Sequence, residues 1–402
     1  MVGERVDVPC FGEWKTDVYS GSPVLSVSTD GDTASAMLDG GFSACSLSCV
    51  IPLPGAPCVR LSAECDTDAG VTDVFAIVSQ LCKGDALTRE HFPVSAKSGG
   101  RILFSGCVTP HIWADSIGIA FYVKGSGISA SFHLPVIELL DEVHSRKARI
   151  ALGYTKYMAV KSYGENAERL TEVTDRCGQA KPDIIVLGEC VYDQSLAISP
   201  EADGGTMQLV MSGKAKEYGC YLVYNYHEAD GGRVYNTSVL FGRDGSEIGK
   251  YRKTHITVDE IESGITPGDE YAVFDLDFGK VGLLTCFDHY FPEPYAALAG
   301  MGAELICIPS MGDARETGPG MAAAHGLYLA VCGMNSENES GMKAARVIAP
   351  GGSVIADGED DGVPVICDID LDAPVRRSWF SFPSTRSDAA TIMRFQKNSH
   401  IK

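Results

Sequence analysis

The sequence predicts an all-β domain followed by an α/β domain, and two observations carry this prediction. Before residue 145, short apolar–polar runs alternate with clusters of Gly, Asp and Ser, and no stretch has a convincing helical period. That pattern is typical of an antiparallel β-sandwich. From Ser145 onward, strand and helix patterns alternate, which indicates helices packed on a central sheet. We therefore expect an accessory β-sandwich over residues 1–143 and an α/β domain over residues 144–402.

The first domain contains five expected strands. They are Cys58–Ala63, Val74–Leu81, Arg101–Cys107, Ile117–Val123 and Ile128–Pro135. Their order loosely resembles the jelly-roll modules of the carbohydrate-binding kind. Trp14 and Trp113 are open to two interpretations, as platforms on which a sugar ring stacks or as packing residues, and packing is the preferred one.

The second domain begins with a strand and then alternates. The expected strands are Arg149–Tyr154, Asp183–Leu187, Cys220–Tyr226, Lys280–Leu284, Glu304–Ile308, Tyr328–Gly333 and Val365–Leu371. The expected helices are Asn166–Cys177, Met207–Tyr218, Pro292–Met301 and Met321–Leu327. Two hairpins are also expected, one turning at Asp244-Gly245 and one within Arg346–Asp357.

Composition excludes several classes of protein. The formal net charge of −20 argues against nucleic acid or an anionic membrane as a partner. No apolar run is long enough to span a membrane, and the N-terminal residues lack the layout of a signal peptide. The 14 cysteines show no paired zinc-ligand spacing. We therefore expect a cytoplasmic protein with reduced thiols and no bound metal.

Cys286 lies where an apolar strand, Lys280–Leu284, gives way to the segment Phe-Asp-His-Tyr-Phe-Pro-Glu. Pro292 and Glu293 suit the first turn of the next helix. A thiol at such a turn lies near backbone N–H groups, which are expected to lower its pKa and to offer an oxyanion site. An isolated cysteine is more often a small buried hydrophobe, so the interpretation of Cys286 as a nucleophile depends on two further segments.

The first of these segments places a carboxylate at a strand end. Glu189 follows the apolar strand Asp183–Leu187, and ligands of α/β sheets gather at that edge. Glu189 can therefore serve as a general base, with Tyr192 beside it. The second segment is Tyr251-Arg-Lys-Thr-His255, which follows the hairpin at Asp244-Gly245. Lys253 in this segment can stabilise an anionic tetrahedral intermediate.

Together these segments resemble the nitrilase superfamily of carbon–nitrogen hydrolases. The family's motifs are a strand that ends in Glu, a Tyr-Arg-Lys-x-His segment after a hairpin, and Cys-aromatic-Asp-x-x-Phe-Pro-Glu followed by Gly-Ala-Glu-Leu-Ile. All three occur here in the family's order, and the resemblance covers roughly residues 146–385. It implies a four-layer α-β-β-α sandwich for the second domain. It also implies a catalytic triad of Glu189, Lys253 and Cys286, and no cofactor.

The resemblance implies further site residues. The family often has a second glutamate between the Lys and the Cys, ahead of a Pro-Gly pair. Here that glutamate is Glu260 or Glu262, before Pro267-Gly268, and Glu260 is the preferred candidate. Near the triad in sequence, Phe287, Tyr192 and His289 are expected to contribute to the substrate or oxyanion site. Members of the family commonly dimerise, so a homodimer or a larger homo-oligomer is expected.

The residues that follow Cys286 narrow the expected reaction. Asp288 follows the pair of nucleophile and aromatic residue, as in the amide- and carbamoyl-hydrolysing branches, whereas true nitrilases more often carry Trp-Glu there. The expected reaction is therefore hydrolysis of a small amide or N-carbamoyl compound through a cysteine thioester. The alternatives are a true nitrilase, a non-catalytic carbohydrate-binding protein with a nitrilase-like core, and a papain-like Cys/His hydrolase. For the last of these, His289 is too close to Cys286 in sequence to be the distant partner that such an enzyme uses.

Overall fold

The structure is a computed structural model. It describes residues 14–373 apart from short gaps, the longest being 141–145, 156–161 and 335–344, and it also describes residues 5–6, 375–376 and 383–384. The chain divides into two compact units, one formed by residues 1–144 with 374–402 and the other by residues 145–373. Within the described residues, no helix is both long and apolar enough to cross a membrane.

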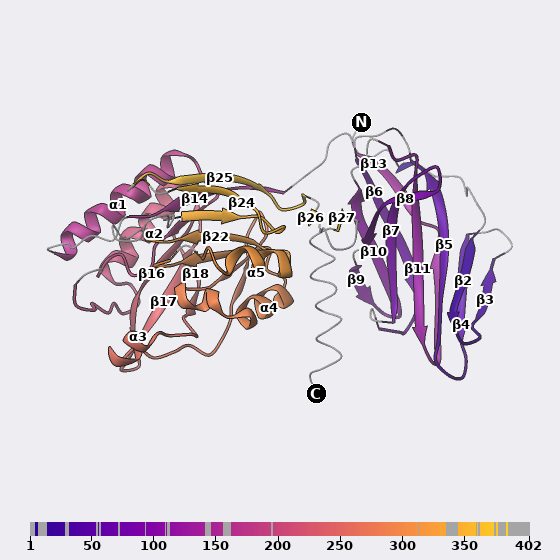
Figure 1. The fold of residues 1–402 in the computed structure, drawn as a ribbon, viewed down its shortest axis with the longest axis horizontal. Coiled ribbons are helices and arrows are strands. Elements are labelled where there is room, and N and C mark those ends of the chain that lie inside the picture. Colours follow the sequence, from indigo (N-terminus) through magenta and orange to yellow (C-terminus); the bar gives the residue numbers. More distant parts are fainter. Residues whose placement is uncertain are drawn as a thin grey trace. The chain divides into compact units, whose positions relative to one another are not determined.

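The first unit is a sandwich of two antiparallel sheets (Figure 1). One sheet follows the order β1-β13-β6-β12-β4-β3, with β10 beside β6 and β9 beside β10. Its strands are β1 (Arg5–Val6), β3 (Val24–Val27), β4 (Thr33–Leu38), β6 (Cys58–Asp66), β9 (Val94–Ser98), β10 (Arg101–Val108), β12 (Ile128–His133) and β13 (Val136–Leu140). The other sheet, in the order β2-β5-β11-β7-β8, contains β2 (Lys15–Ser20), β5 (Ser43–Pro52), β7 (Val74–Cys82), β8 (Asp85–His91) and β11 (Ser116–Gly125).

Aromatic residues of both sheets fill the core of the sandwich. Phe121 on β11 lies 4.5 Å, between ring centroids, from Phe132 on β12 and 5.9 Å from Phe104 on β10. All three side chains are fully buried. Trp14 packs at 6.1 Å from the same Phe121 ring, in agreement with a packing role, whereas Trp113 is 66% exposed. The predicted β-sandwich is confirmed, and each of its five predicted strands is present.

The second unit contains two six-stranded sheets. The first, in the order β18-β17-β16-β15-β14-β25, is built from β14 (Lys147–Gly153), β15 (Ile184–Leu187), β16 (Tyr221–Asp230), β17 (Arg233–Phe241), β18 (Glu247–Arg252) and β25 (Val365–Asp370). The second, in the order β19 to β24, is built from β19 (Val273–Asp275), β20 (Lys280–Leu283), β21 (Leu305–Pro309), β22 (Tyr328–Cys332), β23 (Ala345–Ile348) and β24 (Val354–Gly358).

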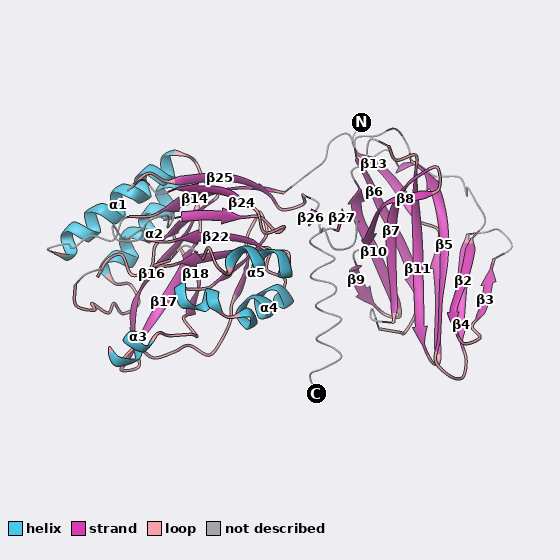
Figure 2. Cartoon of the chain, in the orientation of Figure 1, coloured by secondary structure: helices cyan, strands magenta, loops and turns pink. Residues whose placement is uncertain are grey.

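Helices cover the outer faces of this pair of sheets (Figure 2). α1 (Tyr163–Gln179) and α2 (Thr206–Tyr218) pack on the first sheet, while α5 (Gly318–His325) packs on the second and contacts α4 (Pro292–Met301). The sheets face each other through contacts of β14 and β15 with β22, and of β16 with β21. The predicted four-layer α-β-β-α sandwich is confirmed. Two short elements of this unit remain, α3 (Val258–Glu262) and the 3₁₀ helix η1 (Cys286–Tyr290). Two further short strands, β26 (Val375–Arg376) and β27 (Pro383–Ser384), pair with each other and belong to residues grouped with the first unit.

The buried strands between the layers explain this arrangement. β15 is buried at all four positions and pairs in parallel with β14 and β16, as expected of a strand covered on both faces. α1 begins with the side chain of Ser162, which accepts the N–H of Glu165 and so caps the helix. α4 begins at Pro292 and ends before Gly302, whose φ of 97° suits a residue without a Cβ. These elements bring two strand ends, those of β15 and β20, toward the inner space between the sheets.

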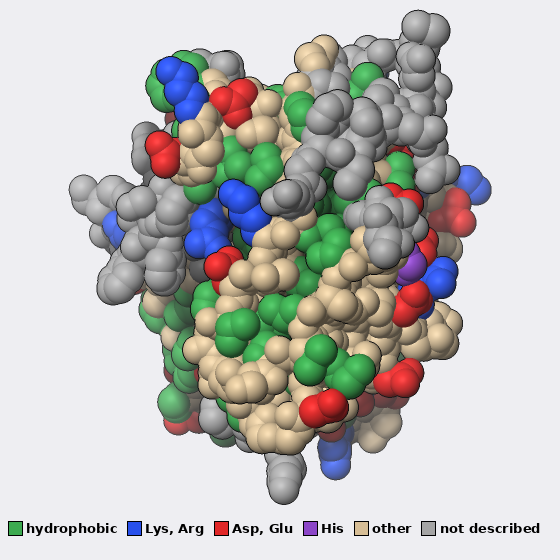
Figure 3. Space-filling view, turned by 90° about the vertical axis from the view of Figure 1, so that its right-hand side faces the viewer, with side chains coloured by type: hydrophobic (Ala, Val, Ile, Leu, Met, Phe, Trp, Pro, Cys, Tyr) green, Lys and Arg blue, Asp and Glu red, His purple; other side chains and the backbone are tan. Residues whose placement is uncertain are grey.

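Charged side chains are unevenly distributed over the face drawn in Figure 3. On the face drawn in Figure 3, Lys and Arg side chains are few, and hydrophobic side chains form separate patches among uncharged ones. The exposed hydrophobic residues of the first unit include Tyr19 at 59% and Phe42 at 62%. Among the described residues drawn on this face, Lys and Arg side chains form no continuous surface, in keeping with the net charge of −20.

Candidate active site

Four of the predicted residues come from four separate segments of the second unit. Glu189 follows β15, Lys253 follows β18, Glu260 lies in α3, and Cys286 begins η1 shortly after β20. Glu189 and Lys253 are 4% and 2% exposed. Because a buried charge is costly unless it is paired, each of these groups must meet a partner of opposite charge.

Lys253 meets two carboxylates. Its Nζ lies 2.9 Å from Glu189 Oε1, and it lies 3.0 and 2.9 Å from the two oxygens of Glu260. Burial disfavours the Lys253 ammonium, but the charges of Glu189 and Glu260 outweigh burial, so the pKa of Lys253 lies above its ordinary value. Burial also opposes the Glu260 carboxylate, yet Lys253 holds the pKa of Glu260 below its usual range. The site therefore keeps a fixed ammonium in contact with two carboxyl groups, and the contact with Lys253 favours the ionised form of Glu260.

The sequence left the choice between Glu260 and Glu262 open, and the structure places only one of them at Lys253. Glu260 belongs to a capping box in which its carboxylate accepts the N–H of Thr257 at 2.8 Å while its own N–H donates to the Thr257 hydroxyl at 3.3 Å. Glu262, two residues further on, is exposed. The backbone at Gly268 packs closely against Arg252, next to Lys253. A Cβ at position 268 would lie 2.3 Å from the carbonyl oxygen of Arg252.

Asparagines that the sequence did not single out hold the carboxylates in place. Asn236 Nδ2 donates to Glu189 Oε1 at 2.9 Å and to Glu260 Oε1 at 2.8 Å. Asn225 Nδ2 in turn donates to Asn236 Oδ1 at 2.9 Å. Both asparagines are buried, on the paired strands β16 and β17. An available signal was the presence of amide side chains inside two otherwise strand-like runs, since a buried polar side chain there needs a partner.

Cys286 lies at a strained position beside Glu189. Its φ of 40° lies in the left-handed region, which residues other than glycine seldom adopt and which costs about 1–3 kcal/mol. The second oxygen of Glu189, Oε2, is buried and has no hydrogen-bond partner among the described residues. The nearby Glu189 carboxylate also acts on the ionisation of the Cys286 thiol. One carboxylate oxygen therefore binds Lys253 while the other remains available for a proton.

The expectation of a lowered thiol pKa is wrong. Burial, followed by the negative charge of Glu189, raises the pKa of Cys286 to about 12, and the ammonium of Lys253 and the backbone at Met311 offset this only in part. The turn and its N–H groups can be recognised in the sequence, whereas the burial of the thiol and the carboxylate beside it depend on the fold. The resting group is thus a neutral thiol, and a base has to remove its proton during attack.

Asp288 ties the lysine segment to the nucleophile turn. This fully buried carboxylate accepts hydrogen bonds from the hydroxyl of Tyr251 at 2.7 Å and from the N–H of Thr285 at 2.9 Å through Oδ2. Its Oδ1 accepts the N–H of His255 at 2.9 Å. The sequence treated Asp288 only as a marker of substrate branch. In the structure it fixes the residues on either side of Lys253 to the residue before Cys286.

The three remaining candidate site residues, Phe287, His289 and Tyr192, have different surroundings in the structure. Phe287 follows Cys286 in the first turn of η1, where N–H groups lack partners within the helix, so an oxyanion role for its N–H stays open. His289 is buried, with Nδ1 3.0 Å from the hydroxyl of Thr317, next to the loop after β21. Tyr192 packs its ring 5.5 Å from that of Tyr163. The hydrogen bonds that join Glu189, Lys253 and Glu260 do not include Tyr192.

Comparison with known proteins assigns the family. The model of the carbon–nitrogen hydrolase family matches residues 158–379, more than half of the chain. The chain therefore belongs to the carbon–nitrogen hydrolases, the nitrilase superfamily, and is an enzyme of that class. The matched segment includes Glu189, Lys253, Glu260 and Cys286, and it leaves the β-sandwich strands outside.

Individual relatives are similar to between about a quarter and three fifths of the chain. Omega-amidase NIT2 of Bos taurus is 29% identical over 267 residues, which are 60% of this chain and 95% of that protein. Omega-amidase NIT2 of Homo sapiens is 28% identical over 61% of this chain and 97% of its own length. A nitrilase of Pyrococcus abyssi is 42% identical over 109 residues, 27% of this chain and 40% of its own. Among solved structures, an amidase from Nesterenkonia sp. has a TM-score of 0.49 and 21% identity, covering 57% of this chain and 92% of its own.

Proposed function

We propose that this enzyme hydrolyses a small amide or N-carbamoyl compound through a thioester on Cys286. The observation that supports this most strongly is the buried contact of Lys253 with Glu189 and Glu260, with the Cys286 thiol beside the unpartnered oxygen of Glu189. This arrangement supplies a nucleophile, a base and a fixed cation in one enclosed place. None of these roles calls for a metal or a cofactor.

The proposed reaction has two stages. In the first, Glu189 Oε2 takes the thiol proton as Cys286 Sγ forms a bond to the carbonyl carbon. The resulting oxyanion is held by the Lys253 ammonium and the N–H of Phe287. Collapse of the intermediate breaks the C–N bond, and the nitrogen leaves with the proton from Glu189. In the second stage, Glu189 takes a proton from water, the hydroxide attacks the thioester, and the thiol of Cys286 is restored as the acid departs.

The environment of Lys253 suits its part in these steps. An ammonium has three N–H donors, and the nitrogen of Lys253 lies near three carboxylate oxygens. One N–H faces Glu189 and a second is shared by the two oxygens of Glu260, which leaves the third for the oxyanion. The carboxylates keep it charged, since its pKa is raised. A donor that is already oriented needs no reorganisation when the oxyanion forms.

The nature of the substrate rests on the relatives. The omega-amidases of cattle and humans, at 29% and 28% identity, favour an amide. A nitrile is the alternative, which the local 42% identity with the nitrilase of Pyrococcus abyssi supports. A panel of small amides, N-carbamoyl compounds and nitriles, with ammonia release as the readout, separates these cases. Turnover confined to nitriles would overturn the amide proposal.

The nucleophile is tested by replacing it. Cys286→Ala is expected to abolish turnover and to leave the circular dichroism spectrum unchanged, because the thiol makes the covalent bond and a methyl group fits the same space. Cys367→Ala on the edge strand β25 is the matched control and is expected to retain activity. Full activity of the Cys286→Ala enzyme, or loss of wild-type activity after EDTA treatment, would contradict the mechanism.

A further inference from the structure

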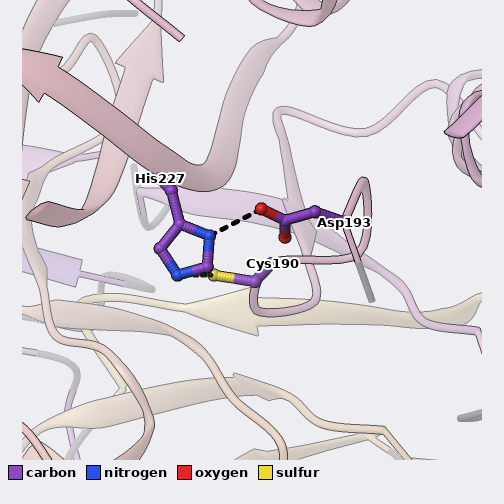
Figure 4. Close-up of side chains that lie close together, drawn as sticks. All are labelled: Cys190, Asp193 and His227. Atoms are coloured by element: carbon purple, nitrogen blue, oxygen red, sulfur yellow. Dashed lines mark hydrogen bonds and ion pairs between the residues drawn. The ribbon is translucent and has the colours of Figure 1, made fainter. Parts of the chain in front are cut away.

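A second group of reactive side chains lies immediately beside Glu189 and has no part in the proposed reaction. Cys190 and Asp193 lie on the turn after β15, and His227 projects from β16 (Figure 4). Their potential ligand atoms all lie within 4.8 Å of one another. Among the residues that the structure describes, no other set of three His, Cys, Asp or Glu side chains meets this condition.

The geometry of the group matches that of metal ligands. Cys190 Sγ lies 3.7 Å from His227 Nε2. Zinc–sulfur and zinc–nitrogen bonds at tetrahedral angles place a sulfur and a nitrogen ligand about 3.5 Å apart. The observed separation thus needs little adjustment for one cation to contact both atoms.

Asp193 orients the imidazole of His227 and favours one tautomer of it. Its Oδ2 lies 2.7 Å from His227 Nδ1, so the proton of a neutral imidazole belongs on Nδ1 and the lone pair of Nε2 faces Cys190. A carboxylate behind a ligating histidine is the usual outer partner of a metal site. Asp193 is itself fixed by the N–H of Ser199 at 3.0 Å. His227 and Asp193 are 9% and 7% exposed, so solvent contributes little to holding them.

We propose that Cys190 Sγ and His227 Nε2, with Asp193 as the outer partner of His227, bind one zinc-class divalent cation, and that its occupation slows hydrolysis at the neighbouring Glu189. Thiolate and imidazole are the ligands that such cations prefer. Binding displaces the thiol proton of Cys190 to solvent, and the sulfur–metal bond takes its place. Water completes the coordination.

A chain of hydrogen bonds connects the group to the active site. Asn225 Oδ1 accepts the N–H of Cys190 at 2.9 Å and lies 3.2 Å from its sulfur. The amide nitrogen of the same Asn225 donates to Asn236, which holds both Glu189 and Glu260. A cation on Cys190 would attract the Glu189 carboxylate, and any movement of Asn225 would reach both glutamates. Slower proton transfer by Glu189 is the expected consequence.

Binding is tested without reference to activity. The Cys286→Ala protein, titrated with Co²⁺, is expected to show the intense visible and thiolate charge-transfer bands of a tetrahedral sulfur-bound ion, at one ion per chain. Adding Cys190→Ser or His227→Gln should remove these bands, and Asp193→Asn should weaken binding about 10–100-fold. His133→Gln is the matched control, because His133 pairs with Asp66 at 2.8 Å but belongs to the β-sandwich unit. Circular dichroism of each variant checks its folding.

The effect on turnover is tested on the otherwise unchanged enzyme with Zn²⁺. Zinc is expected to inhibit the wild-type protein, EDTA is expected to restore activity, and Cys190→Ser is expected to remain active and insensitive to zinc. This second test rests on the proposed function, whereas the cobalt titration does not, so the two can fail separately. Absence of the cobalt bands, or bands that survive both Cys190→Ser and His227→Gln, would overturn the site. Equal inhibition of wild-type and Cys190→Ser enzymes would overturn its coupling to Glu189.

Discussion

At the scale of single residues, the site depends on the charge of Lys253 and on the position of its nitrogen between Glu189 and Glu260. Three short contacts with Glu189 and Glu260 define the position of its nitrogen, and only 2% of the residue is exposed. In such a site the compact ammonium differs sharply from the planar guanidinium, which presents several donors in a fixed fork. The geometry therefore favours lysine over arginine even though both carry the same charge.

Lys253→Arg tests this dependence on geometry. We expect kcat to fall by about 10²–10³, the usual consequence of losing one oxyanion donor, although the positive charge is kept. The measurement is kcat and KM on the best amide of the panel, with Lys250→Arg as a control, because Lys250 is on β18 and pairs with Glu228 at 3.2 Å. A Lys253→Arg enzyme within about twofold of wild type would remove Lys253 from the proposed mechanism.

At the scale of elements, sequence reasoning succeeded where one physical signal dominated. β15 consists of four apolar residues with Glu189 just beyond it, and α4 is marked by a proline at its start and a glycine after its end. Both could be predicted because burial and capping act locally. The predicted helix boundary at Pro292 is correct, but no local signal in the sequence indicated that the short helix η1 would lie between Cys286 and Pro292.

Other elements escaped prediction because their cores are built from small residues. β4 reads Thr-Ala-Ser-Ala-Met-Leu and β5 begins Ser-Ala-Cys-Ser-Leu, so alternation of buried and exposed positions is carried by Ala, Cys and Ser. These residues give little contrast in hydrophobicity. The contacts of Asn225 and Asn236 likewise could not be predicted from the sequence, because they depend on how β16 and β17 are paired. Pairing register is a tertiary property that no local window contains.

The contact between Tyr251 and Asp288 offers a test at this scale. Tyr251→Phe removes the 2.7 Å hydrogen bond to a buried carboxylate that keeps its other donors. It also removes the contacts of the Tyr251 hydroxyl with the hydroxyl and the N–H of Thr254, at 3.1 and 3.2 Å. We expect a loss of about 0.5–1.5 kcal/mol in the free energy of unfolding, together with a lower kcat, because the segment that carries Lys253 loses an attachment to the nucleophile turn. Urea unfolding and steady-state kinetics measure the two effects. Unchanged stability would show that Asp288 does not hold this segment.

At the scale of the whole molecule, all the residues of the proposed mechanism belong to the unit formed by residues 145–373. The family model matches residues 158–379, and NIT2 of Bos taurus is matched over 95% of its length by 60% of this chain. We infer that residues 1–143 contribute no catalytic group. A homodimer or larger assembly, and a place in the cytoplasm, stay predictions.

Removal of the sandwich tests its independence from catalysis. A protein of residues 141–402 is expected to hydrolyse a small amide, because the sheets and helices around Cys286 have their own core, although exposed interfaces would lower its solubility. Activity is best measured as kcat, with thiol titration to count active sites. Complete inactivity of a folded 141–402 protein would show that the sandwich supplies part of the site.

Buried thiols make the molecule sensitive to alkali. Burial raises the pKa of Cys220 to about 11 and that of Cys65 to about 12. Above the pKa of an unfolded thiol, the unfolded chain releases protons that the folded chain retains, so stability present below about pH 9 is lost as pH rises through the folded values. The slope is about 1.4 kcal/mol per pH unit for each such thiol. Urea unfolding between pH 8 and about pH 11 should show this loss, and Cys220→Ala should reduce the slope; an unchanged slope would contradict this account.

The position of Asn236 has a consequence for how the protein can be produced. Asn236-Thr237-Ser238 is an acceptor sequence for N-linked glycans, and the Asn236 side chain is 2% exposed with its amide nitrogen bound to two carboxylates. In a secretory host, sugar transfer occurs on the emerging chain, before the fold can hide that nitrogen. A glycan there could not be accommodated in the folded core. Recombinant protein that is produced through a secretory pathway should therefore misfold or lack activity, because of a glycan on Asn236.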